Sequence, residues 1–313
     1  MKGQPLFTVA TITYNSGKWI RQAIDSVLAS SYSDFEFIIS DDNSNDNTRK
    51  IIQEYNDPRI RVFQNEENTG EYQNRNKVLS EAAGKYILFV DGDDVLYKYS
   101  LRNLSEYVLA FPEAGMIWGL NPQHFPFFIF PYLVQPEVNM QLIYRTPIPI
   151  SNIGFGEIVF RTDVLRAAGG FVLKYKTGDT YIKKKIAMTT PVLYAPIGFI
   201  FWRQSSGQAS KNIKGMHAML DRFAIDNEIL CDPRFPGSLP DRGVIEQNIR
   251  ISQTKIFFSA TVMKGRFLSF FKYASPAGFT FSRLKYLFQK GDYSYSPSPE
   301  LGEPLYNNFN FLR

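Results

Sequence analysis

Along residues 5–119, hydrophobic positions come in blocks whose length and spacing are typical of alternating strands and helices. Short apolar runs predict strands at residues 6–12, 35–39, 60–63, 86–90 and 115–119. Between these runs, apolar residues recur at helical spacing and predict helices near residues 19–28, 48–55, 71–83 and 101–111. This order of elements favours an α/β fold with a doubly wound, mainly parallel sheet.

The predicted strand at residues 86–90 ends directly on three carboxylates, Asp91, Asp93 and Asp94. In open α/β sheets, ligands bind just outside the carboxyl ends of such strands. Clustered carboxylates repel one another and lose hydration on packing, so we expect a cation or a ligand to compensate them. A hard divalent ion that holds a diphosphate would do this. Asp94 has a second interpretation, as the N-cap of the helix that follows.

Two other predicted strand ends also carry polar residues. Tyr14 and Asn15 follow the first strand, and Asp41 and Asp42 follow the second. Because the carboxyl ends of parallel strands meet at one edge of the sheet, these residues and the three carboxylates can line a single crevice.

Residues 120–150 break the alternation, because six prolines are interleaved with Phe125, Phe127, Phe128, Phe130 and Tyr132. Proline in this density argues against a regular helix and against a membrane span. We therefore predict an aromatic loop or a short hairpin beside the site. It could complete the core, or it could cover an acceptor or face lipid.

Beyond residue 150 the pattern returns to the sheet and then becomes helical. Strands are predicted near residues 156–160, 192–195 and 199–202, with a short helix at 163–168. Helical periodicity dominates after residue 210, on a face formed by Met216, Met219, Leu220 and Phe223 and on a long segment at 241–273. Residues 293–299 are predicted to form an irregular tail.

The charged residues are unevenly distributed along the chain. The net charge is +5, and residues 1–240 hold 25 Lys and Arg against 25 Asp and Glu, whereas residues 241–313 hold 10 against 5. Basic residues next to aromatic ones in this last segment suit an anionic membrane surface, although the same aromatic residues could instead pack on the rest of the protein. The excess of basic residues is small and the sequence contains no motif that would read nucleic-acid bases, so we expect no nucleic-acid partner.

The N-terminus lacks a long apolar signal core, and the single Cys231 excludes an internal disulfide. Both features favour a reducing compartment. We therefore expect a cytoplasmic location, with a peripheral position on the inner face of the membrane if the C-terminal segment binds lipid.

Four motifs in order resemble those of the family-2 inverting glycosyltransferases with the GT-A fold. They are Val9…Thr13-Tyr14-Asn15, Asp41-Asp42-Asn43-Ser44-Asn45-Asp46, Asn68-Thr69-Gly70…Arg75-Asn76 and Val90-Asp91-Gly92-Asp93-Asp94. The resemblance is close over residues 5–119 and looser up to about residue 208. It implies transfer of a sugar, with inversion, from a nucleotide-diphosphate donor to an acceptor hydroxyl in surface polysaccharide or glycolipid synthesis.

The resemblance also implies a division of the chain and its partners. Residues 1–119 would bind the nucleotide sugar, residues 120–210 would form the acceptor side, and residues 211–313 would be a helical, basic and aromatic extension. The donor would be a UDP-sugar, and the acceptor a glycan or a polyprenyl-pyrophosphate-linked molecule.

By the same resemblance, Asp91 and Asp93 are the Asp-x-Asp pair of the family. Asp93 would bind Mn²⁺ or Mg²⁺ directly, and Asp91 would assist through water or bind the ribose. The residues implied in donor binding are Thr11, Thr13, Tyr14, Asp42, Arg75, Asp91 and Arg203. Of these, Asp42 would accept hydrogen bonds from the base, and the two arginines would face the base or the diphosphate.

An inverting transfer needs one general base, which the family places in a Glu-Asp pair after a Gly-Gly-Phe-like turn. Here Gly169-Gly170-Phe171 is followed by Gly178-Asp179, so the resemblance assigns this role to Asp179. Gly178 stands where Glu is usual, and Asp179 could instead cap the helix that follows. The run Lys183-Lys184-Lys185 could be a solvated helix face, or it could attract an acceptor that carries pyrophosphate.

Two other functions remain open at this point. A sugar nucleotidyltransferase would need a Gly-rich, basic loop after its first strand, where this chain has Tyr14-Asn15-Ser16-Gly17. A non-catalytic sugar-nucleotide-binding or scaffold protein would fit Gly178, and it would fit residues 204–207, which replace the His that many relatives have after a Trp-Arg pair. The intact Asp91, Asp93 and Asp179 argue against that scaffold role.

Overall fold

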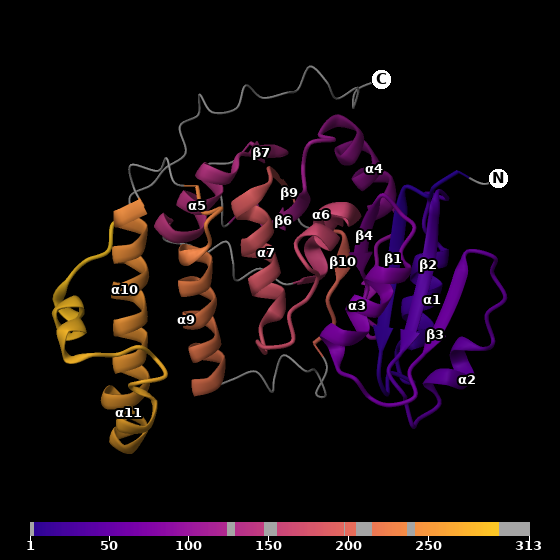
Figure 1. Cartoon of the computed structure of the whole chain (residues 1–313). Coiled ribbons are helices and arrows are strands. Elements are labelled where there is room, and N and C mark those ends of the chain that lie inside the picture. Colours follow the sequence, from indigo (N-terminus) through magenta and orange to yellow (C-terminus); the bar gives the residue numbers. More distant parts are fainter. Residues whose placement is uncertain are drawn as a thin grey trace.

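An eight-stranded sheet with the order β3-β2-β1-β4-β8-β6-β9-β7 forms the centre of the protein, and helices cover it (Figure 1). The computed structural model describes residues 3–123, 129–146, 155–196, 198–204, 215–236 and 242–293. The strands are β1 (Phe7–Thr13), β2 (Phe35–Asp41), β3 (Ile60–Gln64), β4 (Tyr86–Phe89), β6 (Met116–Leu120), β7 (Tyr132–Val134), β8 (Ile158–Arg161) and β9 (Val192–Pro196). A separate two-stranded sheet pairs β5 (Val95–Leu96) with β10 (Ile200–Phe201).

The sheet is mainly parallel, which confirms the predicted fold class. The pairs β3–β2, β2–β1, β1–β4 and β6–β9 are parallel. Strand β8 is antiparallel to β4 and β6, and β7 is antiparallel to β9. Phe7 pairs with Phe35 on β2 and with Tyr86 on β4, so β1 lies between them and the carboxyl ends of all three meet at one edge.

The helices between the strands follow the predicted blocks. They are α1 (Ile20–Leu28), α2 (Thr48–Ile52), α3 (Glu71–Glu81), α4 (Ser100–Ala110), α5 (Pro136–Arg145), α6 (Thr162–Ala167) and α7 (Gly178–Thr189). In α1 the buried residues are Ile20, Ala23, Ile24 and Val27, the same stripe that the sequence shows. A helix of this kind buries one apolar stripe against the sheet and leaves the other side to solvent.

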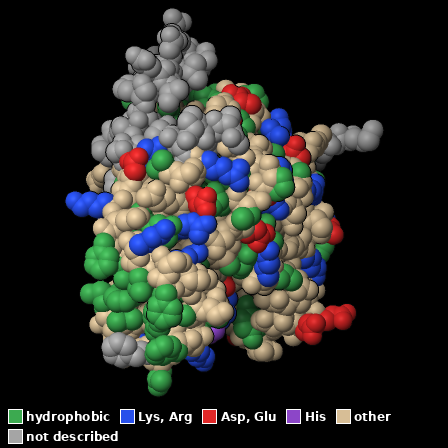
Figure 2. All heavy atoms as spheres, turned by 60° about the vertical axis from the view of Figure 1, so that its left-hand side comes forward, with side chains coloured by type: hydrophobic (Ala, Val, Ile, Leu, Met, Phe, Trp, Pro, Cys, Tyr) green, Lys and Arg blue, Asp and Glu red, His purple; other side chains and the backbone are tan. Residues whose placement is uncertain are grey.

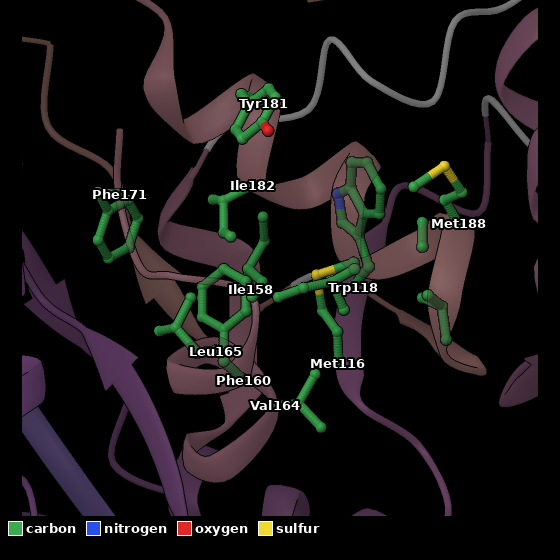
Figure 3. Close-up of a cluster of buried hydrophobic side chains, with 14 of the residues drawn as sticks. Met116, Trp118, Ile158, Phe160, Val164, Leu165, Phe171, Tyr181, Ile182 and Met188 are labelled. Carbon is green, nitrogen blue, oxygen red and sulfur yellow. The ribbon is translucent and has the colours of Figure 1, made fainter. Parts of the chain in front are cut away.

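Two apolar clusters fill the space on either side of the sheet, because successive strand residues point to opposite faces. On β6, Met116 and Trp118 belong to one cluster and Ile117 to the other. Figure 3 shows the first cluster, in which Trp118 lies among side chains from β8, α6 and α7. Trp118 is fully buried, as are Phe160 and Ile182.

The prediction for residues 120–150 is partly wrong, because α5 is a regular helix of ten residues. Pro136 is the first residue of α5, where its missing N–H has no helical acceptor to lose, and no proline follows until residue 147. Met140 and Leu142 are fully buried, so this described part of the segment completes the core. The predicted aromatic loop at Phe125, Phe127 and Phe128 lies outside the described residues.

The C-terminal region is helical, as predicted. It contains α9 (Met216–Cys231), α10 (Arg242–Phe258), a π-helical turn (Ser259–Met263), α11 (Phe267–Tyr273) and a 3₁₀ helix (Phe281–Phe288). Helix α9 packs on α7, and α10 packs on α5 and α9. Their residues Ile225, Ile229, Ile245 and Ile249 belong to the same apolar cluster as Trp118, so these helices share the core of the sheet.

No helix within the described residues combines the length and the apolar character that crossing a bilayer requires. The irregular tail predicted at residues 293–299 lies outside the description apart from Tyr293.

Candidate active site

The candidate site lies where β2, β1 and β4 end side by side. The backbone N–H of Asp42 donates to Thr13 O at 2.8 Å, and that of Gly92 donates to Ile12 O at 3.1 Å. A Cβ at Gly92 would lie 2.6 Å from Thr13 Oγ1, so only glycine lets the chain after β4 pass this close to β1. The loops that carry Asp42 and Asp91 therefore meet at one edge of the sheet.

Asp42 organises the part of this edge that lies at the end of β2. Its Oδ1 accepts hydrogen bonds from Asn65 Nδ2 at 2.7 Å and from both N and Oγ1 of Thr69 at 2.9 Å. Its Oδ2 accepts one from Gly70 N at 2.8 Å. Asn65 and Thr69 also line a hollow of about 640 Å³ at the end of β3. The buried carboxylate thus holds the Asn-Thr-Gly loop against β2, and its proposed contact with a base stays a prediction.

Arg75 is buried. In the sequence, only the surrounding motif distinguishes it from a surface residue of a helix. Its Nη2 donates to Oδ1 and Oδ2 of Asp91 at 2.9 and 2.8 Å. Its guanidinium lies 4.4 Å from the ring centroid of Phe155 and 4.9 Å from that of Phe89. Nη1 has no hydrogen-bond partner within the described residues. Arg75 therefore fixes the Asp91 carboxylate and keeps one buried donor available at the edge of the site.

Arg203 joins the site from the segment after β10. Its backbone N–H donates to Asp94 Oδ1 at 2.9 Å, and its Nε donates to the Asp93 carbonyl oxygen at 2.8 Å. Its guanidinium stacks 4.1 Å from the ring centroid of Trp19. Asp94 directly precedes strand β5, and its carboxylate accepts a hydrogen bond from the backbone N–H of Arg203. The alternative interpretation of Asp94 as the N-cap of a helix is therefore wrong. Burial and then the charge of Asp91 raise the pKa of Asp94 to about 7.

Asp91 and Asp93 offer the hard oxygen donors that Mn²⁺ and Mg²⁺ prefer. In the part of the chain that the structure describes, no three His, Cys, Asp or Glu side chains form a group that could hold a metal ion. An ion bound here would need further oxygen ligands, and such ions commonly take them from substrate phosphates. Burial contributes most to the raised pKa of Asp94, and the charges of Asp91 and Asp93 add to it; a cation would offset this second, electrostatic part. The residues therefore fit an ion that is shared with a diphosphate.

Asp179 is the second residue of α7 and keeps 27% of its side chain exposed. Its Oδ2 lies 3.3 Å from Lys183 Nζ, one turn along the helix, and its Oδ1 accepts a hydrogen bond from Tyr72 Oη at 3.3 Å. Burial alone would raise the pKa of Asp179, but the charge and hydrogen bond of Lys183, together with the hydrogen bonds from Thr180 and Tyr72, outweigh burial and lower it. The carboxylate is therefore ionised at neutral pH and oriented from two sides.

Tyr72 explains why glycine precedes Asp179. A Cβ at position 178 would lie 2.8 Å from Val172 O and 3.0 and 3.2 Å from two ring carbons of Tyr72. The same ring stacks on Phe171 with centroids 6.1 Å apart, and its hydroxyl also donates to Lys176 O. Tyr72 thus fills the space that a side chain at position 178 would use. No local sequence pattern reveals this contact, since the two residues are 106 positions apart.

Replacing Gly178 by Ala is expected to destabilise the protein by about 1–3 kcal/mol, because the added methyl group overpacks against a backbone carbonyl. Urea unfolding would measure this change in the free energy of unfolding. Gly243→Ala is the matched control, since Gly243 also lies in the first turn of a helix and a Cβ there meets nothing within 4 Å. Equal stabilities of the two variants would contradict the packing.

Glu71 connects the two halves of the site and was missed by sequence reasoning. Burial raises the pKa of Glu71, the charge of Arg75 opposes the rise, and the charges of Asp91 and Asp179 add to it. Asp91 and Asp179, which come from distant parts of the chain, therefore both lie near enough to Glu71 for their charges to act on it. The available signal was its position, directly after the Asn-Thr-Gly motif and one turn before Arg75.

Two further predictions can be compared with the structure. Tyr14 is 46% exposed beyond the end of β1, and Thr11 Oγ1 donates to Val90 O at 2.7 Å, so it ties β1 to the chain after β4. The prediction of a solvated or phosphate-attracting lysine face is wrong for Lys183 and Lys184. Both are buried, because Lys183 pairs with Asp179 and Lys184 with Asp226 on α9.

Residues 8–146 match the model of the family described as "Glycosyl transferase family 2". The putative teichuronic acid biosynthesis glycosyltransferase TuaG of Bacillus subtilis is 42% identical over 108 residues, which are 34% of this chain and 43% of that protein. The UDP-Glc:alpha-D-GlcNAc-diphosphoundecaprenol beta-1,3-glucosyltransferase WfgD of Escherichia coli is 38% identical over 90 residues, 29% of this chain and 36% of that protein. The matches thus span less than half of each relative's length.

Among solved structures, a crystal structure of Staphylococcus aureus TarS residues 1–349 in complex with UDP-GlcNAc superposes with a TM-score of 0.61. The superposition covers 87% of this chain and 78% of that one at 20% sequence identity. The similarity at this identity concerns the fold, and it extends past the family match into the C-terminal helices.

Proposed function

Through residues 8–146 this chain belongs to glycosyl transferase family 2, on a GT-A fold, and we propose that it moves a sugar from a nucleotide-diphosphate donor to an acceptor hydroxyl with inversion. The observation that carries the proposal is the edge to which the loops of Asp42, Asp91 and Asp93 come together, with Asp91 and Asp179 both near enough to raise the pKa of Glu71. A donor bound across this edge would have its nucleotide at β2 and its sugar toward α7.

The donor-side roles follow from the contacts. Asp42 and the loop that it holds would face the base, while Tyr14, Thr13 and the backbone at Thr11 line the same strand end. Mn²⁺ or Mg²⁺, held by Asp93 with help from Asp91, would offset the charge that grows on the leaving nucleoside diphosphate. Arg75 and Arg203 would add cationic donors to the diphosphate, since both already lie against the acidic loop.

Asp179 would act as the general base on the acceptor hydroxyl. It is ionised at neutral pH, partly exposed, and held in place by Tyr72 and Lys183. A base in this state can take the hydroxyl proton as the bond to the sugar forms. We also propose that residues 1–119 bind the donor and residues 120–210 form the acceptor side, with residues 211–313 as a helical extension.

The nucleotidyltransferase alternative is less well supported. Its phosphate-binding loop would need free backbone N–H groups after the first strand. Here Asn15 N donates to Ser44 Oγ at 2.8 Å, and Gly17 N donates to Asp46 Oδ2 at 2.9 Å. These donors serve the protein itself and are not offered to a phosphate.

The names of similar proteins support finer proposals about the partners. TarS was crystallised with UDP-GlcNAc, and the E. coli relative is named for a UDP-Glc donor and a diphosphoundecaprenol-linked acceptor. We propose a UDP-sugar as donor, and a glycan or polyprenyl-pyrophosphate-linked molecule as acceptor, in surface polysaccharide or glycolipid synthesis. With such an acceptor, the location that we propose is the cytoplasm, with a peripheral position on the inner face of the membrane.

The experiment is a thermal-shift screen of nucleotide sugars with Mn²⁺. A bound donor at 100 times its Kd should stabilise the folded state by about 2.7 kcal/mol. UMP with Mn²⁺ is the control, because it keeps the base but lacks the diphosphate. If no nucleotide diphosphate or nucleotide sugar raises the melting temperature above this control, the proposed donor class is wrong.

A further inference from the structure

The aromatic residues of the C-terminal segment divide into two sets with opposite surroundings. Phe270, Tyr273, Phe279 and Leu284 pack against Phe223 of α9 and Phe257 of α10. A second set from the same elements points outward, with exposed fractions between 74% and 90%. We call this set the α11 face, and its members are Met263, Leu268, Phe271, Phe281 and Phe288. The first set anchors these elements to the protein, so the second is held outward by a folded support.

The α11 face is a concentrated apolar surface. Figure 2 shows hydrophobic side chains gathered on the lower left of this side of the molecule. Single exposed apolar residues are ordinary on a protein surface, but five within 26 residues on adjacent elements point to an interaction.

The segment that carries the α11 face has charged residues of one sign. Between residues 259 and 291 the sequence contains no Asp or Glu. The exposed cations in this stretch are Lys264, Arg266, Lys272, Lys285 and Lys290. The nearest acidic residue in sequence, Asp292, pairs with Arg145 of α5. Such a surface is complementary to an anionic partner.

We propose that the α11 face docks on the surface of a bilayer that contains anionic lipid. Exposed aromatic and aliphatic side chains insert at the boundary between headgroups and acyl chains, and Lys and Arg at their edge bind anionic headgroups. A second copy of the chain fits less well, because a two-fold interface would bring this all-cationic rim against itself.

The placement of the face agrees with a lipid-borne substrate. In Figure 1, α11 lies at the lower end of the molecule, the end toward which β1 runs from the N-terminus. The carboxyl edge of the sheet and helix α11 therefore lie toward the same end of the molecule, while the 3₁₀ helix that carries Phe281 and Phe288 lies beside α10 (Figure 1). Lipid binding by this face is a property separate from the proposed sugar transfer, because it can be measured without donor or acceptor.

The test is co-sedimentation of the full chain with vesicles of phosphatidylcholine alone or mixed with phosphatidylglycerol. The native chain is expected to bind the mixed vesicles, and Leu268→Ser with Phe271→Ser to lower the partition coefficient at least tenfold. The control is Leu109→Ser with Val62→Ser, which changes two other exposed apolar residues, on α4 and β3. This control should bind as the native chain does.

A charge variant completes the design. Lys264→Gln with Lys272→Gln should remove the preference for anionic vesicles and the sensitivity of binding to salt. Equal vesicle binding by the Leu268→Ser, Phe271→Ser variant and its control would overturn the proposal. It would also be overturned if the native chain bound no vesicles but self-associated in sedimentation velocity, and this variant lost the self-association. Donor-induced thermal shifts should be the same in all variants, so a failure of this proposal is separable from a failure of the proposed transfer.

Discussion

Replacing Asp179 by Asn should abolish sugar transfer and leave donor binding intact. The change removes the group that would take the acceptor proton and keeps the size of the side chain. Tyr72 can still donate to the amide oxygen at position 179, so the local geometry should survive. General-base catalysis typically contributes about 10²–10⁴-fold, and we expect kcat to fall by that order. The donor Kd, measured by calorimetry with UDP and Mn²⁺, should stay within about twofold, since each tenfold change would need 1.4 kcal/mol.

The same change should carry a stability cost, because buried Lys183 loses the charge beside it. Removing one partner of a buried pair leaves the other charge poorly compensated. Partial exposure of Asp179 reduces this cost, and we expect about 1–3 kcal/mol. Activity should therefore be measured well below the melting temperature, so that loss of folded protein does not imitate loss of catalysis.

Asp163→Asn is the matched control for Asp179→Asn. Asp163 is also the second residue of a helix, α6, with 72% of its side chain exposed and an ion pair to Arg161. If Asp179 served only as a first-turn acid of α7, the two variants would differ little in turnover. A turnover number close to that of the native chain for Asp179→Asn would exclude the general-base role of this residue. Absence of transfer by the native chain itself would instead support the scaffold alternative.

The sequence predicted the strands of the donor half well, because each is a short apolar run with polar residues at its carboxyl end. Asp41, Asp42 and Asp91 mark the ends of β2 and β4, so local pattern alone placed the acidic edge. The start of α5 at Pro136 was also readable in principle, since proline at the first helical position costs nothing. The density of prolines around it hid that start.

Other features depend on partners far along the chain, and no local period reveals them. Lys183 and Lys184 look like a solvated run, yet Asp226 on α9 pairs with Lys184 from 42 residues away. The ring of Tyr72 occupies the space next to Gly178. From the sequence alone, Gly178 is only a departure from the family pattern. The aromatic tail is a third case, because its residues divide between core and surface according to how α11 packs on α10.

Replacing Asp93 by Asn should remove the dependence of donor binding on a divalent ion. An amide oxygen is a neutral ligand, and a hard cation binds it less strongly than a carboxylate oxygen. Electrostatic stabilisation by such an ion is worth several kcal/mol, so we expect UDP affinity in Mn²⁺ to fall about 100-fold, or about 2.8 kcal/mol. Calorimetric titrations of UDP with Mn²⁺ and with EDTA would measure the difference, which should nearly vanish in the variant.

Asp91→Asn is the informative comparison, because the two acids stand in different surroundings. Both oxygens of Asp91 accept hydrogen bonds from the buried Arg75, so its loss should lower the free energy of unfolding. Exposure of about a third of the Asp91 side chain limits that loss to about 1–2 kcal/mol. Asp93→Asn should show the opposite balance, with a small change in stability and a large change in Mn²⁺-dependent affinity. Unaltered titrations for Asp93→Asn would defeat its assignment as the metal ligand, and with it the idea that the acidic edge grips a diphosphate through a cation.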